Sequence, residues 1–112
     1  MNILLVEDHT GVVESMTGAL ELRGHTVFWA PDLAAARSLI NSTDAHHPTK
    51  WGLAILDFHL PDGKGTELLP LDFPAVIYSG LPEDAKGAGV PVFSKGDPFA
   101  LIDYIDALGK EA

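Results

Sequence analysis

Reactive side chains follow four short apolar runs of the chain. They are Glu7 with Asp8, Asp57, Ser79 and Lys95, which come after the runs 2–6, 53–56, 75–78 and 90–93 in turn. If these runs are parallel strands of one sheet, the side chains lie together at its carboxyl edge. In open α/β sheets that edge is where ligands bind.

Three carboxylates in one crevice repel one another, and their pKa values rise unless a cation offsets the charge. A hard divalent cation with oxygen ligands provides that offset, and Mg²⁺ suits a site with few carboxylates and open positions. We expect Asp8, Asp57 and the backbone carbonyl of His59 to hold Mg²⁺. Glu7 would hold a metal-bound water.

A carboxylate, a hydroxyl and an ammonium group beside a metal ion are suited to phosphoryl transfer. That reaction spreads negative charge over phosphoryl oxygens, so catalysis consists largely of positioning and charge stabilisation. Asp57 is the candidate nucleophile, because a carboxylate can form a covalent aspartyl-phosphate. Lys95 and Ser79 would stabilise the phosphoryl group from the side opposite the metal.

The elements that position these residues alternate between strand and helix. The predicted strands are 2–6, 26–30, 53–56, 75–78 and 90–93, and the full-length helices are 11–23, 33–40 capped by Asp32, and 98–108 with Asp97 as N-cap and Gly109 as stop. Segment 66–69 has room for one helical turn, and 81–89 for a loop or one turn at 83–86. This alternation predicts an α/β fold with a doubly wound parallel sheet in the order 2-1-3-4-5.

Composition excludes several classes of protein. The chain has 112 residues, which suits one domain, and it has no Cys, so disulfides and thiolate metal sites are excluded. Its net charge of -9 repels nucleic acid and anionic lipid. The apolar run at 2–6 is too short for a signal sequence or a membrane span. We therefore expect a cytoplasmic protein that binds neither nucleic acid nor membranes directly.

Together these motifs resemble the receiver domain of two-component response regulators. The resemblance rests on the acid pair Glu7-Asp8, on Asp57 within Leu-Asp-Phe-His-Leu-Pro-Asp-Gly, on Ser79-Gly80 and on Ser94-Lys95, and it covers residues 1–112. It implies a flavodoxin-like (CheY-like) fold. It also implies that Asp57 accepts a phosphoryl group from a phosphohistidine of a histidine kinase or histidine phosphotransfer protein, and later loses it by hydrolysis. Output would come from a domain or protein outside this chain.

Three features depart from the usual receiver pattern. Val92 stands where such domains usually have an aromatic residue that is coupled to the hydroxyl position, and Phe93 lies one residue later. Gly96 follows the lysine where proline is usual, so we expect a trans peptide bond there. The third and fourth helices are short. These departures point to an alternative function, a degenerate receiver that binds partners without being phosphorylated, whereas the complete set of acids, hydroxyl and lysine argues for the phosphoryl acceptor.

Two enzyme or cofactor classes fit less well. An aspartate-dependent Mg²⁺ phosphohydrolase typically has a second Asp two positions after the nucleophile, where this chain has His59. In a flavodoxin, the acids Glu7 and Asp8 would repel the flavin phosphate.

Single residues also have structural interpretations. An Asp at a strand end can cap a turn, a Ser can bond its own backbone, and a Lys before a helix can be solvated. His46 and His47 are adjacent, which makes them a poor metal pair, and we expect both in a solvated loop. Trp29 and Trp51 are expected to be packing anchors at the margins of the sheet.

Overall fold

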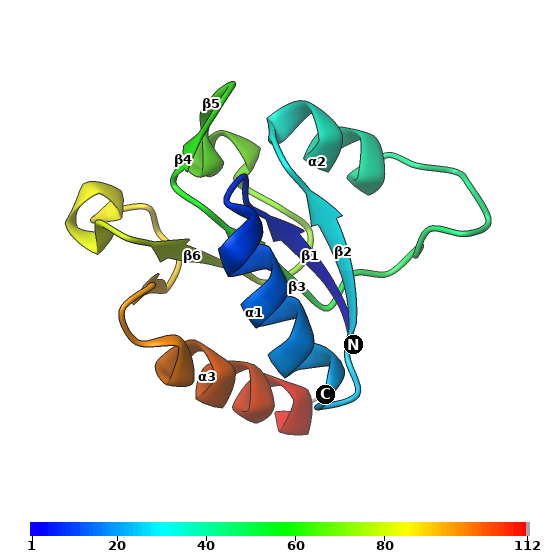
Figure 1. The fold of residues 1–112 in the computed structure, drawn as a ribbon. Coiled ribbons are helices and arrows are strands. Elements are labelled where there is room, and N and C mark those ends of the chain that lie inside the picture. The colour runs from blue at the N-terminus through cyan, green and yellow to red at the C-terminus, as the bar shows by residue number, and fades with distance from the viewer. Residues whose placement is uncertain (112) are drawn as a thin grey trace.

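The computed structural model describes residues 1–111, which form a five-stranded parallel sheet. Helices lie on both faces of this sheet (Figure 1). The strands are β1 (Asn2–Val6), β2 (Thr26–Ala30), β3 (Leu53–Leu56), β6 (Ala75–Ser79) and β7 (Val92–Ser94). Their spatial order is β2-β1-β3-β6-β7, and every neighbouring pair is parallel. The predicted order 2-1-3-4-5 is confirmed.

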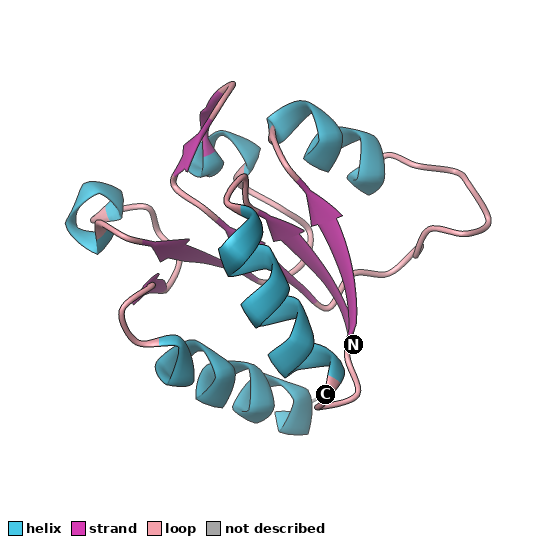
Figure 2. Cartoon of the chain, viewed as in Figure 1, coloured by secondary structure: helices cyan, strands magenta, loops and turns pink. Residues whose placement is uncertain are grey.

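Helices α1 (Thr10–Glu21) and α3 (Pro98–Glu111) cover one face of the sheet, and α2 (Leu33–Ile40) covers the other (Figure 2). Alternate strand residues supply the two cores: Ile3 and Leu5 pack with α1 and α3, whereas Leu4 and Val6 pack with α2. Strands buried on both faces are apolar throughout, as the sequence of β3 is. No helix in residues 1–111 is long and apolar enough to cross a lipid bilayer.

Two helices begin at their predicted N-cap residues, whereas two helix ends differ from the prediction. Asp32 accepts a hydrogen bond from the Ala35 N–H (2.7 Å), and Asp97 accepts one from the Ala100 N–H (3.3 Å), as N-cap residues do. Helix α1 ends at Glu21, two residues before the predicted end, and Gly24, with φ +86°, lies in the turn that closes it. The stop predicted at Gly109 is wrong, because α3 continues to Glu111. A glycine inside a helix costs only about 1 kcal/mol relative to alanine, which does not end a helix by itself.

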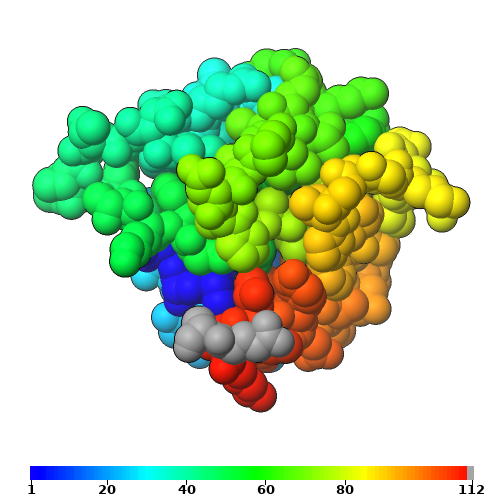
Figure 3. All heavy atoms as spheres, turned by 180° about the vertical axis from the view of Figure 1, so that it is seen from behind, coloured from blue at the N-terminus to red at the C-terminus, as the bar shows by residue number. Residues whose placement is uncertain are grey.

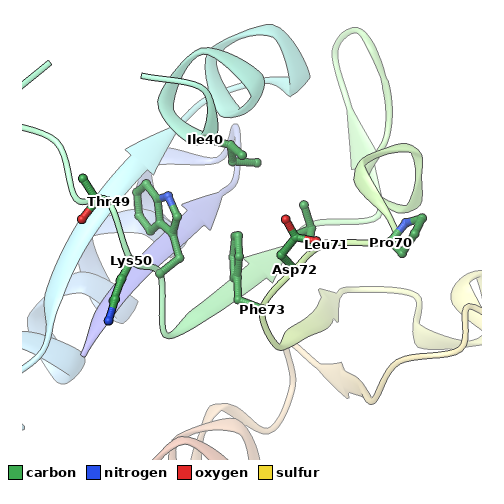
Figure 4. A pocket seen from close by; sticks show the side chains of 8 residues that line it. Ile40, Thr49, Lys50, Pro70, Leu71, Asp72 and Phe73 are labelled. Carbon is green, nitrogen blue, oxygen red and sulfur yellow. The ribbon is translucent and has the colours of Figure 1, made fainter. Parts of the chain in front are cut away.

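The third and fourth helices are reduced to single 3₁₀ turns, η1 (Gly65–Leu68) and η2 (Pro82–Ala85). Seen from behind, the segment 66–75 lies across the middle of this face (Figure 3). Beside it is a hollow of about 440 Å³. Figure 4 shows the side chains that line the hollow, with Ile40 of α2 above Phe73. None of the predicted site residues lines it.

The last strand begins two residues later than predicted, at Val92 rather than Val90. Pro91 accepts a hydrogen bond from the Ile77 N–H (2.9 Å) but has no N–H to donate, so regular pairing starts after it. Val92 packs against the core beneath α2, whereas Phe93 packs on the opposite face, 5.3 Å from the ring of Tyr104. The aromatic side chain is therefore on the other side of the sheet from the usual switch position.

A short antiparallel hairpin of β4 (His59–Leu60) and β5 (Gly63–Lys64) follows β3, and the sequence did not predict it. Asp62 at its turn accepts hydrogen bonds from the Leu33 N–H (2.9 Å) and the Ala34 N–H (3.1 Å). These are the first residues of α2, whose positive helix end favours a carboxylate. The hairpin is thereby attached to the start of α2.

We expect the stabilising effect of Asp62 to depend on pH. The hydrogen bond from Leu33, supported by the one from Ala34, lowers the pKa of Asp62 below its ordinary value of 3.8. A carboxyl group with a lowered folded-state pKa stabilises the fold above its unfolded-state pKa, and this stabilisation is lost as the pH falls through the folded-state pKa. In urea unfolding, Asp62→Asn should therefore be less stable than wild type at pH 7. The difference should shrink as the pH is lowered below 3.8, and an equal difference at both pH values would contradict this assignment.

Candidate functional site

Three carboxylates meet at the carboxyl edge of the sheet, as predicted. Glu7, Asp8 and Asp57 each place an oxygen so that all three oxygens lie within 4.8 Å of one another. Hydrogen bonds that extend the sheet position two of these residues: the Glu7 N–H donates to Ala30 (3.0 Å) and the Asp57 N–H to Val6 (2.9 Å). The side chains of Glu7 and Asp57 are buried, whereas Asp8 is exposed.

Lys95 connects two of these acids from the end of β7, at the same edge of the sheet. Its Nζ lies 2.8 Å from Oε2 of Glu7 and 3.3 Å from Oδ2 of Asp57. Its backbone N–H donates to the Ser79 carbonyl (2.9 Å), which extends the β6–β7 pairing. The Lys95–Gly96 peptide bond is trans, as predicted. Lys95 therefore reaches both acids without a proline after it.

The protonation equilibria follow from this contact. Burial raises the pKa of Glu7, and the charge of Asp57 adds to the rise, while hydrogen bonds with Lys95 and with the His9 N–H act against it. Burial acts to lower the pKa of Lys95, but its hydrogen bond with Glu7 and the charge of Asp57 raise it overall. Lys95 is thus held as a cation beside the acids.

The all-oxygen donor set of Glu7, Asp8 and Asp57 fits a hard divalent cation such as Mg²⁺. One of the three, Asp8, faces solvent, so the site is open on that side to water or phosphate oxygens. Lys95 supplies only part of the charge that three carboxylates need for neutrality. A bound cation would supply the rest and oppose the electrostatic repulsion among them.

Ser79 lies at the end of β6 and is buried at the same edge of the sheet. Its Oγ accepts a hydrogen bond from the Leu81 N–H (3.1 Å), which is the local structural interpretation of this residue. That bond uses an acceptor lone pair and leaves the hydroxyl hydrogen to donate. The placement of Ser79 matches the prediction, and its role toward a phosphoryl group stays a prediction.

His59 lies two residues after Asp57, on β4. Its exposed side chain contacts the carboxylate of Asp84 (Nε2–Oδ2 3.1 Å), which lies in η2. The side chain therefore points to a neighbouring turn. A metal-binding role of the His59 backbone carbonyl stays a prediction.

The sequence did not predict the close approach of Gly65 to the site or the contact that Trp29 makes there. A Cβ on Gly65 would lie 2.1 Å from the Asp57 carbonyl oxygen, so only glycine fits against the end of β3. A Gly after a turn is a signal for such close approach.

Trp29 donates its indole N–H to the Glu7 carbonyl (2.6 Å) and belongs to neither core cluster, so the prediction that it is a packing anchor is wrong. Trp51 does pack against the core beneath α2.

Comparisons with known proteins match this fold to receiver domains. No protein-family model and no curated protein matches the chain. Among solved structures, a CheY-like response regulator receiver domain protein from Methanospirillum hungatei is 26% identical, with a TM-score of 0.75, over 99% of this chain and 98% of that one. The receiver domain of the hybrid histidine kinase CckA is 24% identical, with a TM-score of 0.77, over 96% and 98%.

A third similar structure is that of a response regulator protein from Burkholderia pseudomallei with a phosphorylated aspartic acid, a calcium ion and citrate. It is 22% identical, with a TM-score of 0.67, over 84% of this chain and 59% of that one. This match supports the fold.

Proposed function

We propose that this chain, which has the fold of a response-regulator receiver domain, accepts a phosphoryl group on Asp57 from a phosphohistidine in a Mg²⁺-dependent reaction. The observation that carries the proposal is the contact of Lys95 with both Glu7 and Asp57 beside a third carboxylate. A core of apolar residues does not require buried acids at a strand end. Their joint placement with a cation is suited to stabilising a transferring phosphoryl group.

In the proposed reaction, an Asp57 carboxylate oxygen attacks the phosphorus atom. The new oxygen–phosphorus bond forms as the nitrogen–phosphorus bond of the donor breaks, and the donor imidazole leaves with the electron pair. Lys95 offsets the charge on Asp57 and on the phosphoryl oxygens. Asp8, Asp57 and the His59 carbonyl would hold Mg²⁺, with Glu7 on a metal-bound water. The ion would supply positive charge to the phosphoryl oxygens.

The partners follow from this chemistry. The donor is a histidine kinase or a histidine phosphotransfer protein, and a net charge of -9 favours a basic docking surface on it. The phosphoryl group would later be lost by hydrolysis. A domain or protein outside this chain would read the phosphorylated state.

One observation favours the second candidate, a phosphorylation-independent binding module. Phe93 packs against Tyr104 on the face that α1 and α3 cover, and Val92 occupies the position beneath η2 and α2. The aromatic switch of receivers has no equivalent at that position. A domain of this kind would keep the fold and bind its partner equally well with and without a phosphodonor.

Intact-mass spectrometry after treatment with a small-molecule phosphodonor separates the two candidates. The acceptor predicts a phosphate-sized adduct that forms with Mg²⁺, is absent with a chelator, and is stable in acid but labile in base. A protein that stays at its original mass with Mg²⁺ and donor would support the binding module.

A further inference from the structure

Trp29 is an exposed aromatic residue whose polar atom is fully engaged. Its side chain is 45% exposed, and it packs into neither core cluster. Its indole N–H nevertheless donates to the Glu7 carbonyl over 2.6 Å, a short hydrogen bond for a nitrogen donor. Burial in a core therefore does not account for a tryptophan at this position, and its hydrogen bond to the Glu7 carbonyl needs another explanation.

The hydrogen bond from the Trp29 indole takes the place of a strand-pairing hydrogen bond that β2 does not make to the Glu7 carbonyl. Between β2 and β1, the Thr26 N–H donates to Met1, and the Glu7 N–H donates to Ala30 (3.0 Å). The parallel pattern would next run from the N–H of Asp32 to the Glu7 carbonyl. Asp32 instead has left the strand and caps α2. The Trp29 side chain donates to the carbonyl that this departure leaves open.

Both backbone polar groups of Glu7 are therefore held. The sheet fixes its N–H, and the indole fixes its carbonyl, which belongs to the peptide group that leads to Asp8. Asp8 comes next and is exposed, so packing does not determine its direction. This peptide group sets the direction in which the backbone enters Asp8, whose carboxylate has an oxygen within 4.8 Å of oxygens of Glu7 and Asp57.

We propose that Trp29 is a positioning residue that directs Asp8 toward a divalent cation through the Glu7 carbonyl. This inference rests on the proposed function, because it takes the three acids to be the Mg²⁺ site. Hydrogen-bond partners of metal ligands typically change metal affinity by 10- to 100-fold when removed. Trp29 acts one residue away from the ligand, so we expect the lower end of this range.

The test is calorimetric titration of Mg²⁺ into wild type, Trp29→Phe and Trp51→Phe. Phe keeps an aromatic ring but has no N–H to donate. We expect Trp29→Phe to bind Mg²⁺ about tenfold more weakly than wild type. Trp51→Phe should bind like wild type, because Trp51 packs with Phe28 and Phe73 away from the acids. Circular dichroism and urea unfolding of the metal-free proteins report the folded state of each variant.

Fluorescence gives a second readout that a structural role alone would not produce. The chain has two Trp, so each variant contains one emitter. Trp29 in the Trp51→Phe variant should change its emission on Mg²⁺ addition, whereas Trp51 in the Trp29→Phe variant should not. If Trp29→Phe and wild type bind Mg²⁺ with equal affinity, this inference fails and the proposed function is unaffected. The same holds if metal-free Trp29→Phe is unfolded. Absence of Mg²⁺ binding by wild type would overturn the proposed function and this inference with it.

Discussion

Asp57→Asn is expected to abolish the phosphate-sized mass adduct that wild type gains from a small-molecule phosphodonor and Mg²⁺. Asn has no carboxylate oxygen to attack phosphorus, and it removes one of the three acids that are proposed to hold Mg²⁺. In this variant Lys95 keeps its ion pair with Glu7 but loses the one with Asp57. Asn is close to Asp in size, so the variant should fold.

Asp72→Asn is the matched control for this experiment. Asp72 precedes β6 and lines the hollow shown in Figure 4, outside the acidic cluster. This variant should gain the adduct to the same extent as wild type. An adduct of unchanged yield on folded Asp57→Asn would show that another residue accepts the phosphoryl group, and the proposal for Asp57 would fail.

Gly65→Ala is expected to destabilise the fold by about 1–3 kcal/mol, the usual cost of inserting a methyl group into occupied space. The added Cβ would lie 2.1 Å from the Asp57 carbonyl oxygen and 3.3 Å from Cβ of Leu56. The first contact is with backbone, which cannot rotate away as a side chain does. The end of β3 or the start of η1 must therefore move, and the position of Asp57 would move with it.

Urea unfolding of Gly18→Ala provides the comparison. Gly18 lies within α1, and a Cβ there would contact nothing within 4 Å. The same substitution should therefore stabilise the protein by about 0.5–1 kcal/mol through helix propensity. Gly65→Ala with wild-type stability would contradict the close approach to Asp57.

The strand order and the acidic cluster were predictable from the sequence for the same reason. Apolar runs bounded by turn residues indicate buried parallel strands, and the group after each run must lie at one edge of the sheet. Glu7, Asp8, Asp57 and Lys95 all lie where that argument places them. The placement depends on topology, which the alternation of strands and helices determines.

Features that depend on single contacts were not predictable. The two-residue strands β4 and β5 are too short to show a hydrophobic period. The start of β7 depends on Pro91, whose carbonyl pairs although the residue cannot donate. The bond from Trp29 to Glu7 joins residues 22 positions apart and follows from how β2 ends, for which the sequence has no local signal.

The attachment of Asp62 to α2 has a consequence for local opening of the molecule. The Leu33 and Ala34 amides donate to a carboxylate that belongs to the hairpin, so they become available for hydrogen exchange only when that contact breaks. Segments that share such contacts tend to open as one cooperative unit. The hairpin begins two residues after Asp57, so β4, β5 and the first turn of α2 form one such unit at the candidate phosphorylation site. A modification of Asp57 that stiffens this unit would slow amide exchange in α2 on the far side of the sheet from α1 and α3.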